Sequence, residues 1–205
     1  MDELSFFSFV NDRYNVPRGT FEKLKIYSEL LLKWQKAINL VSRGTLDGFW
    51  KRHVLDSLQL VEHMRGRKIL DIGSGGGFPG MVLGLCGDFD VTCVDSDSRK
   101  MVFLEEVARK TSANVSLITK RIEYYEECDF DTVVSRGFAS LDILVSLTKK
   151  HSQEKYGVFL KGANVSEEIS EAQKSCEFHF ETFDSATDKG GKIVVIKIPE
   201  HQKYE

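Results

Sequence analysis

The chain has 205 residues, of which 41% are hydrophobic and 29% charged, a composition typical of one globular domain of ordinary size. No apolar run approaches the roughly 20 residues that a membrane helix needs. The acidic start Met1-Asp2-Glu3 lacks the basic segment of a secretory signal, so we expect a cytoplasmic protein. A net charge of −3 argues against indiscriminate nucleic-acid binding and restricts any such contact to a local patch. The four cysteines show no paired short spacing, which predicts reduced thiols and no metal site.

The first 65 residues predict a helical cap. Apolar residues recur at helical spacing through most of this region, and Pro17 stands where a helix can begin. The predicted helices cover residues 4–14, 17–38 and 47–63.

From residue 66 onward, β-rich runs alternate with helical segments, which is the pattern of a parallel sheet with helices on both faces. The end of the chain differs, because Gly190-Gly191 and no helix separates the runs at 178–183 and 193–198, and this predicts an antiparallel hairpin. The other predicted strands are 68–72, 89–95, 115–119, 132–135 and 157–161. One predicted helix follows the first of these strands and ends at residue 86, and the others cover 97–111, 141–150 and 166–175. We therefore expect a Rossmann-like α/β domain over residues 66–205, with a mostly parallel seven-stranded sheet.

A glycine-rich loop, Asp71-Ile72-Gly73-Ser74-Gly75-Gly76-Gly77, joins the first strand of this domain to its first helix, at the edge where open α/β sheets bind ligands. Glycines there permit a positive φ and leave the backbone bare enough for a ligand to lie against it. Asp95, followed by Ser96, ends the second strand, where a carboxylate can accept hydrogen bonds from both hydroxyls of a ribose. The loop and Asp95 together predict a cofactor that contains a nucleoside.

Two cofactors fit this arrangement. Residues 75–80 satisfy the dinucleotide pattern G-x-G-x-x-G, so an NAD-dependent enzyme is one alternative. S-adenosylmethionine is favoured, because Asp71 could act on its cationic amino acid end but would repel a pyrophosphate. The full D-x-G-x-G-x-G pattern and the terminal hairpin are typical of class I S-adenosylmethionine-dependent methyltransferases. A loop without any ligand is disfavoured, since five glycines within residues 73–80 would lose chain entropy for no gain.

Seven segments of the chain form a signature far more specific than the cofactor motif. They are Asn39-Leu40-Val41-Ser42, Arg52-His53-Val54-Leu55-Asp56-Ser57, the loop from Asp71 to Gly80, Asp95-Ser96, Ser135-Arg136-Gly137-Phe138-Ala139-Ser140, Leu160-Lys161-Gly162, and Val194-Val195-Ile196-Lys197. The signature resembles the glucose-inhibited division protein B family, which are small-subunit ribosomal RNA methyltransferases that act on guanine N7. The resemblance runs from about Trp34 to Lys197 and departs at Gly137, where alanine is usual, and at Gly76, where proline is common.

The resemblance implies S-adenosylmethionine as cofactor and 16S ribosomal RNA of the small ribosomal subunit as substrate. It also implies that Gly73, Phe78, Ile122, Glu123 and Arg136 line the cofactor pocket. Ile122-Glu123 follows the third strand and Arg136 follows the fourth, which puts both at the edge of the glycine loop. The full set of expected cofactor-binding residues is Asp71, Gly73, Ser74, Gly75, Phe78, Asp95, Ser96, Ile122, Glu123 and Arg136.

Arg136 and Lys161 are the expected catalytic residues, and both would act by positioning. Guanine N7 already carries a lone pair and no proton, so its methylation needs no general base. A salt bridge to a nearby carboxylate is the alternative role for Arg136. Lys161 and the loop 189–192 are also candidates for phosphate contacts. His53 and Asp56, spaced to share one helical face, could pair with each other at the interface between cap and sheet or face the RNA.

Two other functions stay open from the residues alone. A methyltransferase of a small molecule would leave ribosomes inert as substrate, and a non-catalytic module would bind the cofactor without turnover. An NAD-dependent enzyme fits less well, because it would need a crossover that continues the parallel sheet where this chain has a hairpin. We expect a monomer that uses no metal and no membrane.

Overall fold

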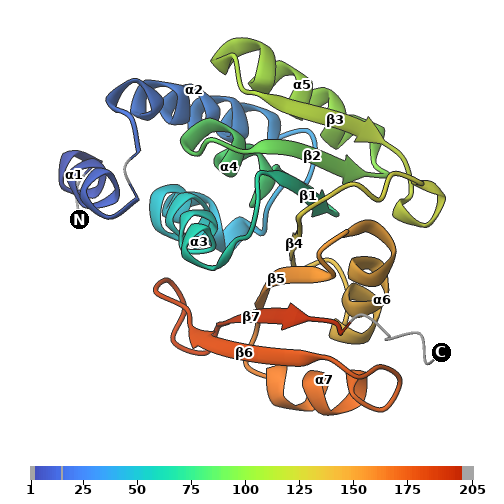
Figure 1. Cartoon of the computed structure of the whole chain (residues 1–205). Coiled ribbons are helices and arrows are strands. Elements are labelled where there is room, and N and C mark those ends of the chain that lie inside the picture. Colours follow the sequence, from blue (N-terminus) through green and yellow to red (C-terminus); the bar gives the residue numbers. More distant parts are fainter. Residues whose placement is uncertain (1–2, 15, 200–205) are drawn as a thin grey trace.

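A seven-stranded sheet forms the centre of the protein, shown in Figure 1 by the computed structural model, which describes residues 3–14 and 16–199. The strand order is β3-β2-β1-β4-β5-β7-β6. Strands β1 to β5 run parallel, whereas β7 is antiparallel to both β5 and β6. The strands are β1 (Lys68–Ile72), β2 (Asp90–Asp95), β3 (Val115–Thr119), β4 (Thr132–Arg136), β5 (Tyr156–Lys161), β6 (His179–Asp184) and β7 (Lys192–Lys197). The predicted parallel sheet with an antiparallel ending is therefore confirmed.

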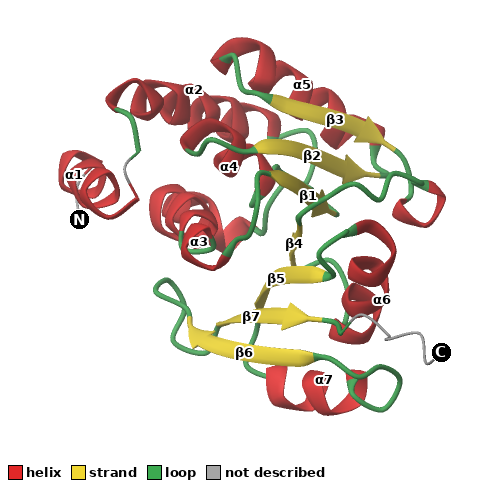
Figure 2. Ribbon diagram, in the orientation of Figure 1, coloured by secondary structure: helices red, strands yellow, loops and turns green. Residues whose placement is uncertain are grey.

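Alternate residues of the central strands enter two separate cores, because successive strand side chains point to opposite faces. Leu70 and Ile72 of β1 pack on the face covered by helices α6 (Leu141–His151) and α7 (Val165–Ala172). Ile69 of β1 packs on the other face, with Leu83 of helix α4 (Gly80–Cys86). That face also carries α5 (Ser98–Thr111), and Figure 2 shows helices on both sides of the sheet.

The N-terminal cap shares one hydrophobic core with helices α4 and α5. The cap begins with the helices α1 (Glu3–Tyr14) and α2 (Arg18–Trp34). Tyr27 of α2 is fully buried and stacks on Phe78 at 5.2 Å between ring centroids. The cap thus packs directly on the glycine loop. None of the helices in the described residues is long and apolar enough to cross a membrane.

The third predicted helix of the cap, residues 47–63, is not continuous. Its place is taken by a 3₁₀ turn at Arg43–Gly48 (η1), a π-helical turn at Phe49–Leu55 (η2), the short α3 (Asp56–Leu58) and a second 3₁₀ turn at Val61–His63 (η3). The wide turn lets Phe49, His53, Val54 and Leu55 all be buried, which a regular helix with one apolar face would not. The apolar periodicity of the sequence does not report such a change of helix type.

Two glycines of the loop are required by packing. A Cβ built on Gly77, whose φ is +93°, would lie 2.5 Å from the hydroxyl of Tyr27 and 2.7 Å from Leu104. A Cβ on Gly80 would lie 2.5 Å from the carboxylate of Asp71. The sheet, α5 and the cap thus close around this side of the loop.

Replacing Gly77 with Ala should lower the free energy of unfolding by about 1–3 kcal/mol, because the added methyl overpacks the contact and the positive φ strains it. Gly19→Ala is the matched control, since nothing lies within 4 Å of a Cβ at Gly19 in α2. Urea unfolding measures both, and equal midpoints for Gly77→Ala and wild type would contradict the packing described.

Candidate functional site

The glycine loop is held against the end of β2 by backbone hydrogen bonds and by Asp95. The amides of Gly73 and Ser74 donate to the carbonyl of Val94, at 2.9 and 3.2 Å. Asp95 accepts from the amide of Gly75 at 2.8 Å through Oδ2 and from the amide of Asp97 at 2.9 Å through Oδ1. Each carboxylate oxygen retains one further acceptor position, so Asp95 can still accept from a ribose.

Gly75 is the open position of the loop. Its φ is +55°, and a Cβ there would meet only the carbonyl oxygen of Gly73, at 3.8 Å. At Gly73 the same construction collides with the ring of Phe138, which lies over that residue. The backbone around Gly75 therefore forms a bare cradle with room for a ligand to lie against it.

Asp71 lies beneath the loop and is fully buried. Its Oδ2 accepts from the amide of Gly80 at 2.9 Å, and Oδ1 has no hydrogen-bond partner within the described residues. Burial raises the pKa of Asp71 to about 7, an effect that the hydrogen bond from Gly80 opposes. Asp71 thus connects the loop to the start of α4, a structural role that the sequence motif does not indicate.

The remaining residues expected at the cofactor lie at the same edge of the sheet. Ser96 is exposed directly after β2, and the amide of Lys120 donates to the carbonyl of Asp95 at 3.1 Å, which brings the end of β3 alongside. Ile122 is buried in a 3₁₀ turn, whereas Glu123 in the same turn is exposed. The ends of β1, β2 and β3 thus gather the expected residues.

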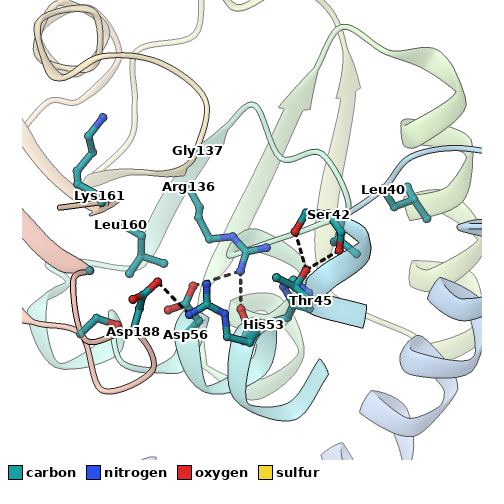
Figure 3. Close-up of a pocket in the computed structure, with 15 residues that line it drawn as sticks. Leu40, Ser42, Thr45, His53, Asp56, Arg136, Gly137, Leu160, Lys161 and Asp188 are labelled. Atoms are coloured by element: carbon teal, nitrogen blue, oxygen red, sulfur yellow. Dashed lines mark hydrogen bonds and ion pairs between the residues drawn. The ribbon is translucent and has the colours of Figure 1, made fainter. Parts of the chain in front are cut away.

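Arg136, at the end of β4, contacts both the cap and the loop. One guanidinium nitrogen donates to the backbone carbonyl of Arg52 at 2.9 Å and to Asp56 at 3.2 Å, and the guanidinium carbon lies 4.9 Å from the ring centroid of Phe78. Figure 3 shows Arg136 and Asp56 pointing toward each other across the pocket. The salt bridge considered from the sequence is present, and the contact with Phe78 places Arg136 beside the glycine loop.

Lys161 points away from Arg136 in Figure 3. Its side chain is 9% exposed, and its ammonium pairs with Glu168 at 2.5 Å and donates to the carbonyl of Ala139 at 2.9 Å. Lys161 also lines the cavity beside Arg136, and the two roles expected for it from the sequence stay predictions. Lys192 is likewise paired, with Asp184, whereas Lys189 is exposed.

His53 and Asp56 have different partners. His53 is 3% exposed and stacks on Phe78 at 4.6 Å, and neither ring nitrogen has a hydrogen-bond partner in the described part of the chain. Burial, followed by the positive charge of Arg136, lowers the pKa of His53 to about 3. Both residues therefore lie in the interface between cap and sheet, one neutral and one charged.

A cavity of about 490 Å³ lies next to Arg136. Leu40–Ser42 of the cap border one side, and the end of β5 and the loop between β6 and β7 border the other. Figure 3 shows Ser42 and Thr45 on one side of Arg136 and Asp188 on the other.

Several residues that shape this site carry no signal in the sequence. Gln35 holds the turn before the cavity, since its Oε1 accepts from the amides of Leu40 and Val41 at 2.9 and 3.1 Å. Gln59 accepts from the amide of Ala186 at 2.9 Å, and Thr187 donates to Asp56 at 2.5 Å. The last two contacts join residues more than 120 positions apart, and no local pattern marks such pairs.

The buried His53 predicts a specific dependence of stability on pH. Because its pKa is about 3 in the folded protein and 6.5 in an unfolded chain, only the unfolded chain gains a proton between these pH values. Wild type should therefore lose stability relative to His53→Phe as the pH falls from about 6.5 to 4, by up to about 1.4 kcal/mol per pH unit. Urea unfolding at several pH values measures the difference, and a constant difference would contradict a neutral His53.

Asp71→Asn supplies a control of opposite sign. The pKa of Asp71 is raised from 3.8 to about 7, so the folded protein binds the extra proton in this range. Wild type should lose stability relative to Asp71→Asn as the pH rises from about 4 to 7. If the two substitutions acted only by disturbing the core, the stability difference from wild type would not change with pH in opposite directions for His53→Phe and Asp71→Asn.

Comparison with known proteins assigns the chain to a family. A model of the family described as rRNA small subunit methyltransferase G matches residues 20–194. A protein of that name from Orientia tsutsugamushi is 41% identical over 195 residues, which cover 94% of this chain and 98% of the relative. Another from Paramagnetospirillum magneticum is 42% identical over 185 residues, covering 89% and 90%.

Solved structures share the fold at low identity. A ribosomal protein L11 methylase from Lactobacillus delbrueckii subsp. bulgaricus superposes with a TM-score of 0.57 at 19% identity, over 71% of this chain and 77% of that one. An S-adenosylmethionine-dependent O-methyltransferase from Thermotoga maritima gives 0.59 at 12% identity, over 84% and 72%. These neighbours confirm the predicted class I methyltransferase fold, and the family match over most of the sequence shows that the chain belongs to the rRNA small subunit methyltransferase G family.

Proposed function

We propose that this protein transfers a methyl group from S-adenosylmethionine to N7 of one guanine in 16S ribosomal RNA, as a monomer in the bacterial cytoplasm. The main observation that supports this proposal is the bare cradle at Gly75, which lies beside Asp95 at the edge of the sheet where Arg136 ends β4. Membership of the family supplies the RNA substrate and the N7 position.

The cofactor would lie against the loop at Gly75, next to Gly73 and Ser74, with its ribose on Asp95 and Ser96. Ile122 and Glu123 would contact the adenine, since the turn that contains them follows β3. Phe78 and Arg136 would border the amino acid end, and Asp71, which is buried below the loop, would act by holding the backbone of the loop in place. When bound, S-adenosylmethionine supplies an electrophilic methyl group.

The protein's part in the reaction is positioning. Guanine N7 presents an in-plane lone pair and has no proton to lose, so no side chain has to act as a base. Arg136 is suited to orienting, because Asp56 and the carbonyl of Arg52 hold its guanidinium in place. His53 is neutral and buried, and burial raises the pKa of Cys86 to about 12. These two groups therefore serve packing in our proposal, and the target base has to leave its stack to reach the site.

Gly75→Val should weaken cofactor binding at least tenfold, because the branched side chain fills the cradle and the positive φ disfavours it. Titration calorimetry with S-adenosylmethionine measures the affinity. Gly19→Val is the control, since a side chain at Gly19 enters open space on α2. Normal binding by a folded Gly75→Val protein would remove the cofactor from this loop.

The function itself is tested with small ribosomal subunits from cells that lack this methyltransferase. Incubation with radiolabelled S-adenosylmethionine should label one guanine of the 16S RNA at N7. Unlabelled subunits together with a labelled metabolite in cell extract would indicate a small-molecule methyltransferase. Cofactor binding without transfer to either would indicate a binding module.

A further inference from the structure

The cavity of about 490 Å³ has no role in the cofactor site described above. Its lining includes Arg136 and Gly137 but none of the residues from Gly73 to Gly80. Arg136 contacts Phe78 of the glycine loop and also lines the cavity. Arg136 thus borders both the cradle of the loop and the cavity.

The two compartments adjoin each other. Leu40 and Val41 line the cavity, and a Cβ built on Gly76 would lie 3.0 Å from the carbonyl oxygen of Leu40 and 3.4 Å from Val41. The same short cap segment therefore touches the loop on one side and the cavity on the other. A ligand in the cavity would be close to a cofactor on the loop, as an acceptor for methyl transfer must be.

The size of the cavity fits a nucleotide, since small-ligand sites have volumes of about 300–1,000 Å³. Its walls combine apolar side chains, Val41 and Leu160, with a charged pair, Asp56 and Arg136. A purine base has the same combination of flat apolar faces and polar edges.

Asp56 gives the cavity a preference for guanine. Its Oδ1 accepts from Gln59 and Thr187, and its Oδ2 accepts from Arg136, which leaves one of about four acceptor positions unused. Guanine offers N–H donors at N1 and N2, whereas adenine has an acceptor at N1 that a carboxylate would repel.

We propose that this cavity receives the target guanine nucleotide after it leaves the RNA stack, with Arg136 beside both the base and the cofactor, so that N7 faces the methyl group directly. The proposal rests on the proposed function and adds a location for the acceptor. It requires that the cavity can be blocked without disturbing the cofactor.

Gly162 allows that test. It is exposed, it lines the cavity, and nothing lies within 4 Å of a Cβ built on it. Gly162→Trp should fill the cavity without a clash, so the melting temperature and the affinity for S-adenosylmethionine should stay as in wild type. Transfer to undermethylated small subunits should fall at least 100-fold in kcat/KM. Gly19→Trp, which also enters open space, should retain full transfer.

A readout without turnover uses guanosine 5′-monophosphate in the presence of S-adenosylhomocysteine. The nucleotide should shift the methyl NMR signals of Val41 and Leu160 in wild type but not in Gly162→Trp, and adenosine 5′-monophosphate should shift them less. If Gly162→Trp perturbs folding, Ser42→Phe blocks the cavity from the exposed side of the cap and should show the same pattern.

Wild-type transfer by a folded Gly162→Trp protein would overturn the proposal. Loss of cofactor affinity in step with transfer would overturn it as well, since the cavity would then belong to the cofactor. Inert wild-type protein would instead refute the proposed function, so the two failures are distinguishable.

Discussion

The contact between Arg136 and Asp56 joins the three parts of the protein that meet at the site. Arg136 ends β4, Asp56 begins α3 of the cap, and Thr187 extends the contact to the loop between β6 and β7. Both charged side chains are largely buried, at 21% and 14% exposure, so removing either would leave the other charge poorly compensated. The same guanidinium lies on Phe78, and the shape of the glycine loop is therefore coupled to the position of the cap.

Hydrogen bonds from both the sheet and the cap hold the glycine loop in place. Asp71 and Asp95 hold it to the sheet through the amides of Gly80 and Gly75, and Tyr27 donates to the carbonyl of Gly76 from the cap. Its glycines consequently differ in purpose. Gly77 and Gly80 permit close packing, whereas Gly75 leaves room for a ligand. A loop held by these hydrogen bonds is preorganised, which matters when positioning is the protein's main contribution to the reaction.

Burial removes charge from groups that are often reactive in other enzymes. His53 is neutral above a pKa of about 3, and the pKa of Asp71 is held near 7, both because solvent is excluded around them. Their titration consequently affects folding, with opposite dependence on pH. This division agrees with a reaction in which N7 of guanine loses no proton.

The sheet, the hairpin and the edge that carries the glycine loop could all be predicted from the sequence, because strand periodicity and the glycine motif are local patterns. The strands β1 and β3 match their predicted ranges residue for residue, and the others differ by a residue at one or both ends. The broken third helix, the pairing of Lys161 with Glu168, and the partners of His53 and Asp56 could not be predicted in this way and became visible in the folded protein. The cavity belongs to the same group, since Ser42 and Asp188 on its walls are far apart in the chain. Such features depend on which surfaces meet when the cap docks on the sheet, and the free energy of that docking is summed over contacts that no short segment contains.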